Sequence, residues 1–178
     1  MALKPTIYRF SIELADLDRE RYDTLNLTVA LHPSETPERM LARILAFCFS
    51  AQERLQFSRG LSDPDEPALW SRTLDGRIDS WIEVGEPTFD RIRKAISLSE
   101  QTSVYCFNTR AGVWWEQIQP QLKALPVSVY RLPWAALQTL AGSVSRTMAI
   151  SVTISGGALY LSAGADTIEL SREELQIA

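Results

Sequence analysis

Residues 78–94 constrain the fold more than any other stretch, because they combine a strand, a tight turn and the start of a helix. Alternation along IDSWIEV places Asp79, Trp81 and Glu83 on one face of the strand, and Gly85 follows at the turn. Two carboxylates four residues apart on a strand lie about 13 Å apart, so Asp79 and Glu83 cannot hold one ion alone. The stretch predicts either a solvated edge strand or half of a metal-dependent phosphodiester site.

The length and charge of the chain limit its organisation and its partners. At 178 residues, we expect a single domain spanning residues 1–178, with enough apolar sequence for a sizeable core. The formal net charge of −4 argues against a protein that coats nucleic acid through bulk charge. A local basic groove on an acidic body remains compatible with this composition.

Cysteine, histidine and the N-terminal residues indicate a compartment and exclude some chemistry. Cys48 and Cys106 lie in the apolar contexts AFCFS and VYCFN, which favours two reduced core thiols in a cytoplasmic protein over a disulfide or a zinc site. The single histidine, His32, precedes a proline and is interpreted as a turn residue, which argues against a Ser-His-Asp triad. MALKPTIYRF contains no long apolar run, so we expect no signal peptide and no membrane association.

The two ends of the chain are rich in predicted strands. Residues 6–16 and 22–31 alternate around a polar turn and predict a hairpin. Glycine-containing turns separate three further strands, expected at 146–154, 158–163 and 167–170. The terminal strands, within residues 6–31 and 146–170, are predicted to join in a second sheet.

The centre of the chain, residues 37–132, alternates between helices and strands. Ser34 or Thr36 is expected to cap a helix that starts at Pro37. The expected elements are a helix at 37–52, strands at 54–59, 68–73 and 78–84, a helix at 88–101, a strand at 103–108, a helix at 111–123, a strand at 127–132 and a short helix at 134–141. From Pro37 to Phe107 the order is therefore αβββαβ, which predicts a mixed α/β (α+β) fold.

This order resembles the core of the restriction-endonuclease-like, or PD-(D/E)XK, superfamily. In that superfamily, carboxylates on two neighbouring strands hold Mg²⁺ and a nearby lysine helps to position the attacking water. Here Pro64-Asp65 precedes the second strand, and Glu83 lies on the third, 83 − 65 = 18 residues later. The spacing suits the hairpin between those strands.

A more specific resemblance covers nearly the whole chain. The segments MALKPTIYRF, HPSETPERM, ERLQFSRGL, IDSWIEVGEP, NTRAGVWW and SRTMAISVTI together closely resemble the bacterial YaeQ family. The resemblance implies a small cytoplasmic protein with a variant PD-(D/E)XK fold. It does not by itself imply an activity, because one fold hosts many functions.

The sequence departs from the superfamily pattern at Gly85, which stands where active members usually carry the lysine of Glu-x-Lys. Lys94 on the following helix is the best replacement, and Arg91 and Arg93 are the alternatives. Lys94 and Arg91 share a helix face through their i, i+3 spacing.

The resulting hypothesis is a Mg²⁺ site, because Mg²⁺ prefers carboxylate oxygens and can generate hydroxide near neutral pH. The expected metal ligands are Asp65, Glu66, Glu83 and Glu38, the expected catalytic residues are Asp79, Glu83 and Lys94, and the expected nucleic-acid contacts are Arg91, Arg93 and Arg110.

Each of these residues also has a simpler interpretation. Glu38 favours a helix N-terminus by ~0.5 kcal/mol, and Asp65 and Glu66 suit a solvated turn. Asp79 suits an ion pair across the hairpin with Arg77 or Arg72, and Trp114 and Trp115 suit the core and a groove wall more than base stacking.

Three functional hypotheses remain open from the sequence. The first is a Mg²⁺-dependent nuclease-like hydrolase acting on DNA or RNA. The second is a catalytically inactive nucleic-acid-binding or regulatory module on the same fold. The third is an interaction scaffold whose terminal sheet pairs through its edge strands. The sequence does not determine the oligomeric state.

Overall fold

A computed structural model describes residues 3–178, which form four α-helices and two mixed β-sheets. The helices are α1 (Pro37–Ser50), α2 (Phe89–Leu98), α3 (Ala111–Leu122) and α4 (Trp134–Ala141). The strands are β1 (Thr6–Asp16), β2 (Arg21–Leu31), β3 (Gln56–Phe57), β4 (Leu69–Arg72), β5 (Ile78–Val84), β6 (Ser99–Cys106), β7 (Val127–Arg131), β8 (Thr147–Ser155), β9 (Ala158–Ala163), β10 (Asp166–Ser171) and β11 (Glu173–Gln176). The fold is mixed α/β, as the sequence predicts.

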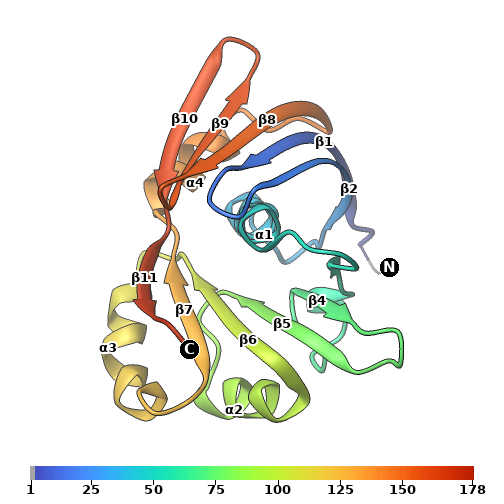
Figure 1. The fold of residues 1–178 in the computed structure, drawn as a ribbon. Coiled ribbons are helices and arrows are strands. Elements are labelled where there is room, and N and C mark those ends of the chain that lie inside the picture. Colours follow the sequence, from blue (N-terminus) through green and yellow to red (C-terminus); the bar gives the residue numbers. More distant parts are fainter. Residues whose placement is uncertain (1–2) are drawn as a thin grey trace.

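The elements form layers, with α1 and α4 between the two sheets and with α2 and α3 on the outer side of the six-stranded sheet (Figure 1). One buried cluster fills the space around α1 and includes Ile12, Ile44 and Ile82. A second cluster lies under α2 and α3 and includes Val104 and Ile118. The central strands are therefore covered on both faces, and the C-terminal halves of β5 and β6 are the most buried.

The five-stranded sheet has the order β10-β9-β8-β1-β2 and unites the two ends of the chain. β1 and β2 form the predicted hairpin, in which Thr6 pairs with Leu31 and Asp16 with Arg21. β1 also pairs in parallel with β8, with Ile12 opposite Ile150. The prediction that the terminal strands join in a second sheet is confirmed.

The six-stranded sheet has the order β11-β7-β6-β5-β4-β3, and β5, β6 and β7 are parallel. The element order from α1 through β3, β4, β5 and α2 to β6 matches the predicted αβββαβ order. In the middle of this sheet, β5 spans the predicted residues 78–84. Its C-terminal end therefore lies between β4 and β6.

Two predicted elements are shorter than expected. The strand expected at 54–59 is reduced to Gln56–Phe57, because the chain turns at Arg54, whose φ is 62°. The helix expected at 88–101 ends at Leu98, and β6 begins at once at Ser99. Ser99 pairs with Ile78 of β5, so pairing with β5 overrides the helical pattern of this segment.

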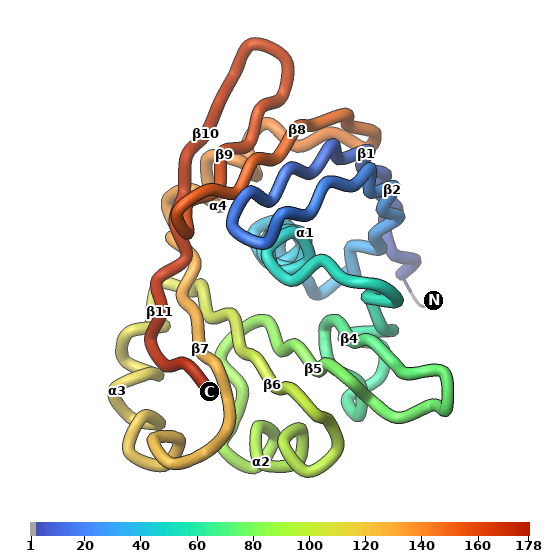
Figure 2. The backbone as a smooth tube through the Cα atoms, in the orientation of Figure 1, coloured from blue at the N-terminus to red at the C-terminus, as the bar shows by residue number. Residues whose placement is uncertain are grey.

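A C-terminal strand was not expected from the sequence. After β10 the chain leaves the five-stranded sheet and crosses to the edge of the six-stranded sheet, where β11 runs antiparallel to β7 (Figure 2). Gln176 fixes it there, because its amide donates to the carbonyls of Leu122 at 2.9 Å and Val127 at 3.1 Å. The segment EELQ has no apolar alternation, so no strand signal marked it.

Local signals at α1 and at the cysteines agree with expectation. Thr36 caps α1 by accepting a hydrogen bond from the Arg39 N–H at 3.2 Å. Cys48 and Cys106 are free and buried, and burial raises the pKa of each thiol to about 12, so the interpretation as core thiols is confirmed. Among residues 3–178, no helix has the length and apolar character needed to cross a membrane.

Candidate functional site

A cleft of about 400 Å³ opens at the C-terminal end of β5. Its walls are the end of β5 and the turn after it, the loop before β4, the start of α2 and the end of β6. The polar residues that matter below are Glu83, Arg91, Glu66, Arg39 and Asn108. The cleft thus lies at the position where the sequence predicted a site.

Glu83 is the central carboxylate of this cleft, and it is only 6% exposed. Its Oε1 accepts hydrogen bonds from the Trp81 indole at 2.8 Å and from Arg91 Nε at 2.9 Å. Arg91 also donates to the carbonyls of Pro64 and Glu66, the latter at 2.8 Å. Arg91 therefore ties the loop before β4 to the strand that carries Glu83.

Asp65 and Lys94 meet at the rim of the cleft. Lys94 Nζ lies 2.9 Å from Asp65 Oδ1, and both side chains are exposed. The hydrogen bond from Lys94 holds the pKa of the Asp65 carboxyl below its ordinary value. The structure therefore brings these two predicted residues together as an ion pair.

The Glu66 carboxylate is bound by Arg59 and not by Arg91 or Lys94. The carboxylate accepts from Arg59, at 2.8 Å from both the backbone N–H and Nη2. Hydrogen bonding to Arg59 lowers the pKa of the Glu66 carboxyl. Only the Glu66 carbonyl is held by Arg91.

Asp79 and Glu38 are not brought into the cleft. The pairing register of β4 and β5 shifts beside Asp79, which leaves it without a partner in β4 and breaks the expected alternation. Its carboxylate accepts a hydrogen bond from Ser71 at 3.3 Å, in place of the expected pairing with Arg77 or Arg72. Glu38 lies in the first turn of α1, outside the cleft lining.

The predicted nucleic-acid contacts occupy three different environments. Arg91 is held inside the cleft, as described above. Arg93 is exposed, lies 3.8 Å from Asp90 and stacks over the Phe89 ring. Arg110 is exposed and precedes α3. Arg93 and Arg110 are thus accessible, whereas Arg91 is engaged by the protein.

Trp114 and Trp115 behave as their simpler interpretation predicted. Trp115 is buried with Ile118 in the cluster under α3. Trp114 donates its indole N–H to the Pro87 carbonyl at 2.9 Å and so fastens α3 to the turn before α2. Neither ring is a free stacking platform.

As these residues lie, they do not fit a Mg²⁺ ion. Within residues 3–178, no group of three or more His, Cys, Asp or Glu side chains could hold a metal. Glu83 is engaged by Arg91, Asp65 by Lys94 and Glu66 by Arg59, so cations of the protein already contact the expected ligands.

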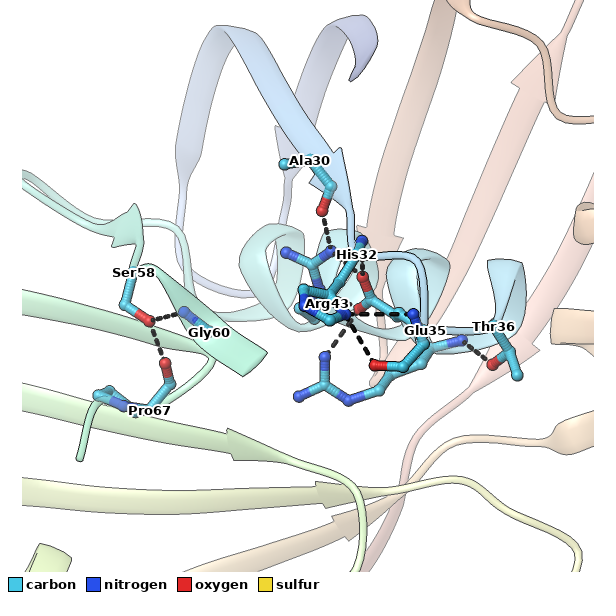
Figure 3. A network of polar contacts seen from close by, with 10 residues as sticks. Ala30, His32, Glu35, Thr36, Arg43, Ser58, Gly60 and Pro67 are labelled. Carbon is cyan, nitrogen blue, oxygen red and sulfur yellow. Dashed lines mark hydrogen bonds and ion pairs between the residues drawn. The ribbon is translucent and has the colours of Figure 1, made fainter. Parts of the chain in front are cut away.

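A second buried carboxylate, Glu35, lies beside the cleft and was not expected from the sequence (Figure 3). Its Oε1 accepts from Arg39 Nη1 and Arg43 Nε, both at 2.7 Å, and its Oε2 accepts from Arg43 Nη2 at 2.8 Å. Arg43 also donates to the Ala30 carbonyl at 3.0 Å, which joins α1 to β2. Burial lowers the pKa of the Arg43 guanidinium, and the charge of Glu35 opposes that shift. Arg43 interrupts the apolar run MLARILAF, which was the signal for a buried ion pair.

The backbone conformation at position 85 explains why this residue is glycine. Its φ is 126°, a conformation that side chains rarely adopt, so a lysine at this position would be strained. The Gly85 N–H donates to the Tyr105 carbonyl at 2.9 Å, and Glu86 then accepts from the Asn108 N–H at 3.0 Å. The turn after β5 is thereby fixed against β6 in a conformation that favours glycine at position 85.

Comparison with known proteins places these features in a family. A family model described as "YaeQ protein" matches residues 1–172. A Salmonella typhi protein named "Uncharacterized protein YaeQ" is 44% identical over 172 residues, covering 96% of this chain and 95% of the relative. The Escherichia coli (strain K12) protein of the same name is 41% identical over 173 residues, covering 96% of each chain.

Two crystal structures agree with this fold along nearly their whole length. The YaeQ protein from Xanthomonas axonopodis pv. citri superposes with a TM-score of 0.94 at 34% identity, covering 98% of this chain and 99% of the other. The YaeQ protein from Pseudomonas syringae gives a TM-score of 0.93 at 39% identity, covering 98% of this chain and 97% of the other.

Proposed function

This chain belongs to the YaeQ family, and from that premise we propose that its cleft binds the phosphate backbone of single-stranded nucleic acid without hydrolysing it. The proposal includes the finer fold assignment, in which residues 37–132 form a variant PD-(D/E)XK core. The proposed compartment is the cytoplasm, in keeping with two free, buried thiols.

The main support for the proposal is that two cations on α2 are paired, in the described part of the chain, only with exposed carboxylates. Lys94 lies one turn after the cleft residue Arg91, and the neighbouring Arg93 is exposed on α2. Within residues 3–178, the only carboxylate partners of Lys94 and Arg93 are the exposed Asp65 and Asp90. Exposed ion pairs contribute little, because both partners stay hydrated. A phosphate can therefore replace Asp65 or Asp90 at small cost.

The shape of the cleft favours an unpaired strand. A volume of about 400 Å³ is near the lower end of the range for ligand pockets, which is enough for one nucleotide and too small for a duplex. The exposed side chain of Arg110, just beyond β6, offers a further donor at this end of the sheet, whereas the Asn108 amide already donates to the Glu86 carboxylate. Because the chain carries a net charge of −4, we expect binding to be confined to this surface.

Binding without hydrolysis follows from the pairing of the carboxylates. Glu83 is buried and held by two donors, and Gly85 leaves no lysine beside it. A Mg²⁺ ion would have to share Glu83 with Arg91 and Asp65 with Lys94, whose positive charges oppose its binding.

The test is fluorescence anisotropy of short labelled DNA and RNA strands with the full chain, in chelator and between about 50 and 200 mM salt. We expect affinity to fall with salt, and the double variant Arg93→Gln/Lys94→Gln to lower the slope of log K against log salt by about 1.4, or ~0.7 for each phosphate contact. Separate DNA and RNA arms identify the preferred strand.

The matched control is Lys4→Gln/Arg9→Gln, which removes two exposed charges at the N-terminal end of the other sheet. If both double variants lose affinity equally, or if the wild type does not bind either strand, the proposal is wrong. Mg²⁺-dependent cleavage that disappears in Glu83→Gln would instead establish the hydrolase hypothesis.

A further inference from the structure

A second polar cavity, of about 180 Å³, lies towards the opposite end of β5. It is enclosed by the C-terminal end of α1, the α1-facing side of β5, β6 and β7, the turn between β1 and β2, and the segment joining β10 to β11. Gln101, Ser103 and Tyr105 are alternate residues of β6 and therefore share the face that lines it. The cavity shares no lining residue with the Glu83 cleft.

Arg172 brings a positive charge to this cavity from the segment between β10 and β11. The side chain is half-buried, and its guanidinium stacks 4.1 Å from the centre of the Tyr130 ring and 4.7 Å from that of Phe49. Its Nη1 donates to the Tyr105 hydroxyl at 2.6 Å. Within residues 3–178 no carboxylate forms an ion pair with Arg172, and its other N–H groups make no hydrogen bond.

The groups around Arg172 within residues 3–178 form no ion pair with it. Burial raises the pKa of the Tyr105 phenol above its ordinary value, so this partner is uncharged at neutral pH. The nearby Asp18 carboxylate accepts hydrogen bonds from the N–H groups of Gly156 at 2.7 Å and Gly157 at 2.9 Å. These bonds, and to a smaller extent the charge of Arg172, lower the pKa of Asp18. The other cation of the cavity, Arg19, is paired with Asp16 at 2.6 Å. The residues that line the cavity include these two arginines and no carboxylate.

Neutral hydrogen-bonding side chains complete the lining. Ser80 of β5, Ser103 and Gln101 of β6 and Tyr130 of β7 all line the cavity. Their side chains make no hydrogen bond to any other residue in the described part of the chain, 3–178. Hydroxyl and amide groups on three neighbouring strands thus face the same space as the unpaired guanidinium.

We propose that this cavity binds a phosphate group, as inorganic phosphate or as the phosphate of a small phosphomonoester, with Arg172 as its charged donor. A guanidinium presents paired N–H groups that match two phosphate oxygens. The serine, glutamine and tyrosine groups reach the remaining oxygens from the sheet. At ~30 Å³ per water, the volume equals about six waters, which suits phosphate with a few attached carbon atoms.

The experiment is calorimetric titration of the full chain with inorganic phosphate, glycerol phosphate and acetate, with chloride holding the ionic strength constant. We expect saturable binding of phosphate or glycerol phosphate, and the tighter of the two identifies the form recognised. Acetate should bind far more weakly, because a planar carboxylate offers only two oxygens. Acetate binding as tight as phosphate binding, or no phosphate binding, would overturn the proposal.

Variants assign the binding to Arg172. Arg172→Gln should weaken phosphate binding by about tenfold or more, because it removes a charged donor. Arg72→Gln is the matched control, since Arg72 also stacks on an aromatic ring, 4.2 Å from Trp70, but lies outside the cavity. Ser80→Ala/Ser103→Ala keeps the Arg172 stack intact and should also weaken binding. If the Arg172 and serine variants all bind phosphate as the wild type does, the assignment is wrong.

Discussion

The two ends of β5 place arginines in opposite electrostatic situations. Near the C-terminal end, Arg91 donates to Glu83, and Arg43 close by donates to the buried Glu35. Towards the other end, Arg172 donates only to the hydroxyl of Tyr105. Arg91 and Arg172 each line a polar cavity beside β5. The two arginines therefore differ in whether a carboxylate is bound to them, and not in the kind of cavity they line.

This difference separates structural arginines from an arginine available to a ligand. A buried charge costs free energy unless an opposite charge offsets it. The buried Arg43 is offset by Glu35, and the buried Glu83 is offset by the partly exposed Arg91. Arg172 is half-buried with no such offset, and an incoming anion would supply it. Four changes to the paired and unpaired groups test this distinction.

The largest effect is expected from Glu35→Ala, which leaves the buried Arg43 without its carboxylate. Removing one member of a buried pair typically costs about 3–5 kcal/mol, and urea unfolding measures it. The control is Glu173→Ala, which breaks the exposed pair with Arg131 and should cost less than about 1 kcal/mol. Equal losses in the two variants would show that burial does not distinguish these pairs.

Glu83→Gln should have a smaller effect, because Arg91 is partly exposed and can be hydrated when its partner is neutral. Glutamine keeps the shape and an acceptor for the Trp81 indole, so we expect a loss of about 1–3 kcal/mol in the free energy of unfolding. Urea unfolding of Glu116→Gln, a neutralisation at an exposed and unpaired site on α3, provides the baseline. A Glu83 variant as stable as that baseline would contradict a structural role for the pair.

Ser103→Asp is expected to give Arg172 a carboxylate partner, because Ser103 and Arg172 line the same cavity. We expect phosphate binding to disappear while the free energy of unfolding changes by less than about 1 kcal/mol. Ser103→Asn has nearly the same shape without the charge, and it should keep measurable phosphate binding in the same titration. Loss of binding in both variants would point to shape and not to charge.

The smallest effect concerns the exposed pair of Asp65 and Lys94. Lys94→Gln should raise the pKa of Asp65 towards its ordinary value, because the hydrogen bond that lowers it is removed. The pair stabilises the folded state only while Asp65 is ionised. Its contribution is present above the unfolded-state pKa and is lost as the pH falls through the folded-state pKa. NMR titration of the Asp65 carboxyl measures the shift, and Lys123→Gln should leave it unchanged.

Much of the fold could be predicted because strand alternation and helix-capping residues are visible in short stretches of the sequence. The hairpin of β1 and β2 follows from alternation, the start of α1 from Thr36 and Pro37, and β5 from the run IDSWIEV. β11 was not predicted because it is an edge strand whose sequence, EELQ, does not alternate between apolar and polar residues. Its place depends on pairing with β7, which only the folded chain supplies.

The family, the αβββαβ order and the position of Glu83 at the end of a central strand follow from the order of the amino acids alone. Which charged groups pair with one another follows only from the folded chain. Ion pairs depend on distances of about 3 Å between groups far apart in the chain, such as Lys94 and Asp65, 94 − 65 = 29 residues apart. Within residues 3–178, Arg172 forms no ion pair with a carboxylate, although the next two residues along the chain are Glu173 and Glu174. Adjacent positions in the sequence therefore do not ensure that two charged groups meet in the folded chain.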